Sequence, residues 1–404
     1  MSGTKTNRGS AKENRWSTPI RAQPAAEQAP VPPLARLIAV LVLLFVFMLG
    51  VNGLGDGFKS LGRGFLDSFF SATANPFMGL IIGILATTLV QSSSVTTSLI
   101  VGLVAAPENP LPVANAVPMI MGANIGTTVT NSLVSLAHMG RKDEFRRAFA
   151  VATCHDFFNY MAVLILLPIE LTTGYLQKTA TFLSSYLVGL GGAEYESPIR
   201  GALKSVLGPI KSAIGALVEK PEAAAILLIA VSGVLIFTAL VSLVKVMRAA
   251  MQTRVELFIS RALDVSPLLA MLVGIIVTVM VQSSSITTSL LVPLAGAGIL
   301  TLRQAFPITI GANIGTTVTA FLAALAATGP YAQAAVTMAL VHLLFNVSAT
   351  MLIYPVERIR EIPLRAARWL ARTATRSKRW ALAYVLGLFY ALPALFAIVD
   401  HFVG

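Results

Sequence analysis

Two segments of this sequence place hydroxyl and amide side chains in strongly apolar surroundings. QSSSVTTSL at 91–99 and QSSSITTSL at 282–290 differ at one position of nine, and an uncharged apolar run precedes each. Small residues that only let helices pack closely would not need a glutamine at the same place in both. Because buried polar groups without partners cost several kcal/mol each, the pattern predicts that these residues bind a polar solute.

A second repeated motif contains asparagine, threonine and glycine. GANIGTTVT occurs at 122–130 and again, letter for letter, at 311–319. Glycine favours a break in the helix, and carbonyl oxygens at an unwound helix end, with Asn and Thr oxygens, form a cage suited to Na⁺. Helix N-termini at the QSSS segments suit an anion, and sodium ions bound nearby would supply the positive charge that these segments lack. The candidate ligands in the two motifs are Asn124, Thr127, Thr128, Asn313, Thr316 and Thr317.

Asp156 is a carboxylate in the middle of an apolar stretch, 148–168. Charged residues inside membrane helices are costly and usually functional, so Asp156 is a candidate cation ligand. Its counterpart in the second half of the chain is Leu343, and the fold therefore does not require an acid here. The alternative is a structural contact with His155 or a neighbouring helix. Two pairs that match between the halves are expected to brace helices: His155 with His342, and Asn159 with Asn346.

The composition indicates an integral membrane protein. Of 404 residues, 55% are hydrophobic and 12% are charged, about half the charged share of soluble domains. The formal net charge of +12 comes from basic loops beside apolar segments, which favours the positive-inside rule over nucleic-acid binding. One cysteine excludes an internal disulfide, and four scattered histidines lack metal-ligand spacing. No nucleotide loop or catalytic triad is present, so we do not expect an enzyme.

The expected spans are 37–55, 148–168, 224–244, 335–354 and 381–400, with 114–137 and 305–326 long enough but interrupted by polar residues.

The chain contains two copies of one unit, here called copy 1 (37–170) and copy 2 (224–357). The repeated motifs above align in the same order in both, as in transporters built from internal repeats. We therefore predict an all-α polytopic membrane protein with inverted repeats, each containing a re-entrant hairpin with QSSS at its tip and a helix broken at GANIGTT. The other predicted units are a disordered cytoplasmic tail (1–36), an external linker with amphipathic segments (171–223), a basic cytoplasmic segment (358–380) and a final span (381–404).

Loop charges predict the orientation of the copies. The basic loop 138–147 matches an uncharged loop at 327–333, and Glu108 in copy 1 matches Arg303 in copy 2. The copies should therefore lie in opposite orientations. In copy 1, the charge-poor loop 105–113 should lie outside and the basic loop 138–147 inside. Both conditions hold only if 76–104 enters the membrane and returns to the same side. This count places the N-terminus in the cytoplasm of a cell-membrane protein and the C-terminus outside.

Paired QSSS motifs, each followed by GANIGTT, together with EFRRAFA at 144–150 and CHDFFN at 154–159, resemble the type II sodium–phosphate cotransporters. The resemblance implies import of inorganic phosphate, as HPO₄²⁻, with co-transported Na⁺. In that family, electrogenic members have alanine, alanine and aspartate where this chain has Ala150, Ala152 and Asp156. By that resemblance, Asp156 binds one additional sodium ion and net positive charge moves inward.

The resemblance also implies the distribution of ligands between the two substrates. The phosphate ligands would be Gln91, Ser92, Ser93, Ser94, Gln282, Ser283, Ser284 and Ser285. The sodium ligands would be the GANIGTT residues and Asp156, with Thr97, Gln282, Ser283 and Thr288 in addition. Expected partners are phosphate, sodium and the lipid bilayer, without nucleic acid, and an oligomer is compatible with the sequence. The alternatives are transport of another oxyanion, coupling to H⁺, or an ion channel.

Overall fold

The structure is a computed structural model in which every regular element is helical. It describes residues 33–60, 71–106, 110–189, 198–262, 266–327 and 331–403. The predicted tail 1–36 therefore lies almost entirely outside the described residues, and helix α1 (Pro33–Ser60) begins within its last four positions. Six helices of the described part are long and apolar enough to cross a membrane: Leu37–Leu54, Lys142–Thr173, Pro221–Ala239, Leu302–Leu325, Ala332–Ile353 and Lys378–Asp400. The prediction of an all-helical multi-pass protein is confirmed.

The helices of copy 1 recur in copy 2 in the same order. The matched elements are α1 with α10 (Pro221–Ala262), α3 (Pro76–Val90) with α11 (Pro267–Val281), α4 (Ser93–Val104) with α12 (Ser284–Gly296), α5 and α6 (Val113–Thr127 and Val129–Leu136) with α13 (Leu302–Ala326), and α7 (Lys142–Thr173) with α14 (Ala332–Ile353). The first helices, α1 and α10, pack against each other, and Gly53 lies so close to Ser232 that a Cβ would be 2.5 Å from its Oγ. Such close approach through small residues is typical of membrane helices.

Both QSSS segments form the turn of a hairpin of two short helices, hairpin 1 (α3–α4) and hairpin 2 (α11–α12). Each first helix starts with a proline at its first turn, after Asn75 or Ser266 as the capping residue. Each ends at a glutamine in the left-handed conformation, with φ of 57° at Gln91 and 55° at Gln282. The first helices have 15 residues each, about 22 Å, which is less than the roughly 30 Å of a bilayer core.

The glycines of the GANIGTT motifs do not break the helix in copy 2. α13 runs without interruption through its motif, and in copy 1 only Thr128 separates α5 from α6, with helical backbone angles of −76° and −20°. A Cβ at Gly122 would lie 2.0 Å from the carbonyl oxygen of Leu80, and a Cβ at Gly311 would lie 2.0 Å from that of Met271. The predicted broken helix is therefore wrong for copy 2 and is a single-residue interruption in copy 1. The glycines are needed because they let each helix touch the first helix of its hairpin.

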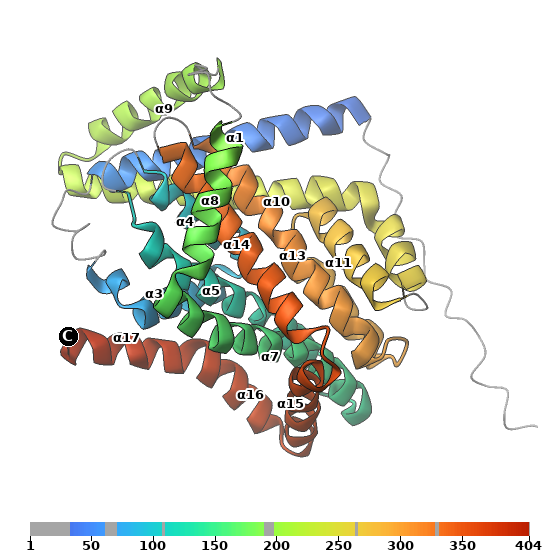
Figure 1. The fold of residues 1–404 in the computed structure, drawn as a ribbon. Coiled ribbons are helices and arrows are strands. Elements are labelled where there is room, and N and C mark those ends of the chain that lie inside the picture. Colours follow the sequence, from blue (N-terminus) through green and yellow to red (C-terminus); the bar gives the residue numbers. More distant parts are fainter. Residues whose placement is uncertain are drawn as a thin grey trace, which may run out of the picture.

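After each copy, the chain crosses onto the other one. Helix α8 (Tyr175–Gly189) follows α7 but packs on α14, where its Ser184 lies 2.8 Å from the hydroxyl of Thr337. Helix α15 (Glu357–Arg376) follows α14 but packs on α7. The segment predicted as a linker thus begins with a packed helix and includes α9 (Pro198–Leu217). In Figure 1, α1 and α10 lie along one side of the molecule, and α16 (Lys378–Leu386) and α17 (Leu392–Val403) along the opposite side.

Candidate functional site

The tips of the two hairpins meet at the hydroxyl of Thr319. Its Oγ1 lies 3.3 Å from Ser94 Oγ of hairpin 1 and donates to Gln282 Oε1 of hairpin 2, also at 3.3 Å. In copy 1, Thr130 at the matching position of α6 donates in the same way to Gln91 Oε1, at 3.1 Å. The structure therefore brings the two QSSS segments, nearly 200 residues apart in sequence, to one place.

Both tips present the N-terminus of a helix. The caps are Ser92 and Ser283, whose hydroxyl oxygens accept from the N–H of Val95 and Ile286, at 3.3 Å each. The other N–H groups of a first helical turn have no acceptor within the helix and, with the helix dipole, favour an anion. Of the remaining serines at the two tips, Ser93, Ser94 and Ser284 are buried and Ser285 is partly buried. The glutamines differ, since Gln91 is exposed and Gln282 is buried.

Asp156 is fully buried in α7 and only half of its carboxylate is paired. Oδ2 accepts hydrogen bonds from Ser132 Oγ at 3.1 Å and from Tyr384 OH at 2.8 Å. Oδ1 has no hydrogen-bond partner among the residues that the structure describes, although Thr128 lies close enough to interact with the carboxylate. A buried carboxylate with an unpaired oxygen is costly in an apolar interior. It can therefore serve as a ligand for a cation.

The threonines predicted as sodium ligands donate to carbonyl oxygens of their own helices. The distances from Oγ1 are 2.8 Å for Thr127 to Ala123, 2.9 Å for Thr128 to Ile125, 3.0 Å for Thr316 to Ala312, 2.7 Å for Thr317 to Ile314, 3.4 Å for Thr97 to Ser94 and 2.8 Å for Thr288 to Ser284. A hydroxyl that donates still has lone pairs for a cation. These residues lie on α4 and α12 of the hairpins, on α13, and at the end of α5, and their role as sodium ligands stays a prediction.

Asn124 and Asn313 belong to a buried network of amides. Asn313 Oδ1 lies 2.7 Å from His155 Nε2, and its Nδ2 donates to Asn159 Oδ1 at 2.7 Å. Asn124 accepts from Asn159 through its main-chain oxygen at 2.7 Å and from Asn346 through Oδ1 at 3.2 Å. The network joins helices of both copies. Since other side chains already occupy both amide oxygens, a sodium ion would have to share them, and the ligand role of these two residues stays a prediction.

Sequence reasoning did not identify several residues of the site. Thr130 and Thr319 had a usable signal, because they are the last residues of the repeated GANIGTTVT. Asn131 and Ser132 follow that motif but have no match in copy 2, where Ala320 and Phe321 occupy the aligned positions. Tyr384 belongs to the C-terminal span, outside both copies, and nothing in the repeat pattern indicated that it reaches Asp156.

Comparison with known proteins identifies the family of the chain. The model of a family described as Na⁺/Pi-cotransporter matches residues 46–192 and 223–361, in two parts that overlap the two copies. The chain belongs to this family. The family consists of transporters, so this protein is a transporter and not an enzyme.

Named relatives extend the similarity over most of the chain. It is 33% identical to rat sodium-dependent phosphate transport protein 2A over 93% of this chain and 71% of that protein. It is 32% identical to human sodium-dependent phosphate transport protein 2B over 89% of this chain and 64% of that protein. The chain thus spans about two thirds of the length of these relatives. No solved structure is significantly similar to it.

Proposed function

We propose that this protein is a secondary active transporter that moves inorganic phosphate into the cell together with sodium ions. Membership of the Na⁺/Pi-cotransporter family supports this function. The observation that carries it is the meeting of the two QSSS tips at Thr319, because a transporter built from repeats binds its substrate at the interface between them.

The phosphate dianion would bind between the N-termini of α4 and α12. There it would receive hydrogen bonds from main-chain N–H groups and from the hydroxyls of the two QSSS segments. No lysine or arginine belongs to either segment, so the co-transported sodium ions would supply positive charge. This makes phosphate binding dependent on sodium.

The two hairpins would enter the membrane from opposite faces. Their short helices support re-entry, since none of them is long enough to be a candidate span, and the reversed loop charges of the two copies support entry from opposite faces. Irregular backbone at a hairpin tip is tolerated within a membrane where protein or a water-filled cavity surrounds it. Alternating access would then expose the tips first to one side and then to the other.

Asp156 would bind one additional sodium ion through its unpaired Oδ1, so that each transport cycle moves net positive charge inward. Moving one charge through 100 mV is worth about 2.3 kcal/mol. That corresponds to roughly fifty-fold in the accumulation ratio of phosphate.

Uptake of labelled phosphate into proteoliposomes tests these proposals. We expect accumulation against a phosphate gradient with sodium outside but not with potassium, and faster uptake when the inside is made negative. Asp156→Asn should keep sodium-dependent uptake and lose its response to the potential. Asp143→Asn is the matched control, since this exposed acid on the same helix pairs with Arg146 at 3.2 Å. Uptake without accumulation would indicate a channel, and sodium-independent uptake would contradict coupling to sodium. If uptake by Asp156→Asn still responds to the membrane potential, Asp156 does not bind the sodium ion that carries the net charge.

A further inference from the structure

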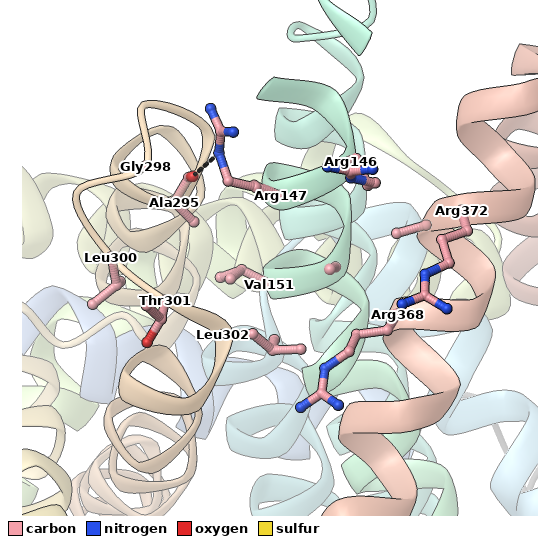
Figure 2. Close-up of a pocket in the computed structure, with 12 residues that line it drawn as sticks. Arg146, Arg147, Val151, Ala295, Gly298, Leu300, Thr301, Leu302, Arg368 and Arg372 are labelled. Carbon is pink, nitrogen blue, oxygen red and sulfur yellow. Dashed lines mark hydrogen bonds between the residues drawn. The ribbon is translucent and has the colours of Figure 1, made fainter. Parts of the chain in front are cut away.

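A cleft of about 450 Å³ lies away from the hairpin tips and is lined by four arginines. Arg146 and Arg147 extend from α7, and Arg368 and Arg372 extend from α15 (Figure 2). The rest of the lining is mostly apolar: Ala150, Val151, Ala295, Leu300, Leu302 and Ala371, with Gly298 and Thr301. The cleft thus combines guanidinium groups with an apolar floor, which the QSSS tips do not.

The two arginines of α7 retain most of their positive charge within the cleft. Arg146 pairs with Asp143 at 3.2 Å, but both side chains are largely exposed and such pairs are weak. Arg147 Nε donates to the main-chain oxygens of Ala295 and Gly296, at 3.1 and 3.0 Å. Carbonyl oxygens accept hydrogen bonds without neutralising the guanidinium.

The arginines of α15 are also incompletely neutralised. Arg368 lies 3.4 Å from the buried Glu361. That single carboxylate is shared with Arg303 at 2.7 Å and Arg365 at 4.0 Å. Arg372 has no ion pair or hydrogen bond through its side chain among the described residues, and Figure 2 shows it beside Arg368. The cleft therefore has an excess of positive charge and an arginine available to a ligand.

Helix α15 has the composition of a helix at a membrane surface. It is not one of the candidate spans, it is strongly amphipathic, and its buried face packs on α7 through Leu370, Ala371 and Ala374. Its Trp369 is 65% exposed. Arginines on the polar face and an exposed tryptophan are typical of helices that lie between headgroups and acyl chains.

We propose that the arginine cleft is a second anion site, which binds the phosphate group of an anionic molecule. Guanidinium groups bind phosphate oxygens through pairs of parallel hydrogen bonds. The expected source is the headgroup of an anionic phospholipid, because the cleft is much larger than a phosphate ion and has an apolar floor for the glycerol end of a lipid. Free inorganic phosphate is the other source of the same chemistry. A bound headgroup would connect α15 and α7 with the segment between α12 and α13, and so would restrain hairpin 2.

Titration calorimetry on the full chain in detergent tests this proposal, in potassium buffer without sodium. The ligands are dioctanoyl phosphatidylglycerol, dioctanoyl phosphatidylcholine and inorganic phosphate, each added to wild type, Arg372→Glu and Arg376→Glu. Arg376 is the matched control, since it is exposed on the same helix, one turn further on, and does not line the cleft. We expect phosphatidylglycerol to bind, phosphatidylcholine to bind at least about tenfold more weakly, and Arg372→Glu alone to lose about tenfold in affinity for phosphatidylglycerol.

Two other results are informative. Phosphate binding that Arg372→Glu weakens and Arg376→Glu does not would support the site and identify a soluble anion as its source. If Arg372→Glu does not selectively lower the affinity for any of the three ligands, or if both variants lose affinity equally, the cleft is not a specific site. Because Arg372 has no partner among the described residues, the variant should fold, and an unchanged unfolding temperature without ligand checks this.

Discussion

The two hairpins share eight of nine residues at their tips, yet their hydroxyls have different partners. In hairpin 2, Thr278 donates to Thr287 at 2.9 Å, and Ser289 donates to Asn131 of copy 1 at 3.1 Å. In hairpin 1, the matching Thr87 and Ser98 are buried and, among the described residues, have no hydrogen-bond partner for their hydroxyls. Two matching hydroxyls are thus hydrogen-bonded in hairpin 2 and unpaired, among the described residues, in hairpin 1.

The difference arises in the helix that faces each hairpin. Hairpin 2 meets the polar start of α6, with Asn131, whereas the aligned residue of copy 2 is Ala320 on α13. A buried hydroxyl without a partner costs about 1–3 kcal/mol. At this motif position, hairpin 2 therefore has a hydrogen bond to copy 1, from Ser289, that the matching Ser98 of hairpin 1 lacks.

Gly122 and Gly311 make the same close helix contact in the two copies, so substitutions there should have the same effect. We expect this effect, a loss of folded protein, to be the largest of those tested. Gly122→Ala and Gly311→Ala would each place a methyl group 2.0 Å from a main-chain carbonyl oxygen of the facing hairpin. Backbone cannot yield as a flexible side chain does, so both variants should fail to give folded protein. Gly233→Ala is the control, since a Cβ there meets nothing within 4 Å. The measurement is the yield of monodisperse protein after size exclusion, and a folded Gly311→Ala beside an unfolded Gly122→Ala would show that the two contacts are not equivalent.

Much of the fold could be predicted because the repeat doubles every signal. Proline at the start of each hairpin helix and the matched QSSS turns place the short helices correctly. The GANIGTT glycines were misinterpreted, because glycine permits both a helix break and a close helix contact, and only the facing helix decides between them. The crossing of α8 and α15 could not be predicted, since no local pattern states which helix an apolar face will meet.

The sequence indicated candidate site residues where both copies have the same polar residue or where a charge lies in an apolar helix, and it did not indicate isolated hydroxyls. The QSSS serines and Asp156 stood out by repetition and by charge. Ser132 and Tyr384, which donate to Asp156, did not, because isolated hydroxyls in apolar helices usually serve packing. A polar residue in one copy that aligns with an apolar residue in the other, such as Asn131 with Ala320, is the signal that would have indicated Asn131 and Ser132.

Asn131→Ala gives copy 1 the residue of copy 2 and should have an intermediate effect. It removes the acceptor of Thr288 and Ser289, at 2.9 and 3.1 Å, and a contact of His155. Thr288 keeps the main-chain oxygen of Ser284, so the loss should be about 1–3 kcal/mol, mostly for Ser289. A lower midpoint of thermal unfolding and slower sodium-dependent uptake are the expected readouts. Unchanged stability would mean that the hydrogen bonds to Asn131 do not stabilise hairpin 2 and that the contrast between Ser289 and Ser98 has no energetic weight.

The smallest and sharpest test compares serines at the same motif position. Ser289→Ala removes a hydrogen bond to Asn131 and should destabilise the protein by about 0.5–1.5 kcal/mol. Ser98→Ala removes a hydroxyl that has no partner among the described residues and should be neutral or slightly stabilising in sodium-free buffer. Thermal unfolding of both variants, with and without sodium, tests whether the unpaired hydroxyl of Ser98 serves as a sodium ligand or stabilises the protein without sodium. If Ser98→Ala reduces only the stabilisation that sodium provides, Ser98 binds the ion beside Thr97. If it destabilises the sodium-free protein as much as Ser289→Ala does, the Ser98 hydroxyl is stabilising without sodium and the contrast with Ser289 is wrong.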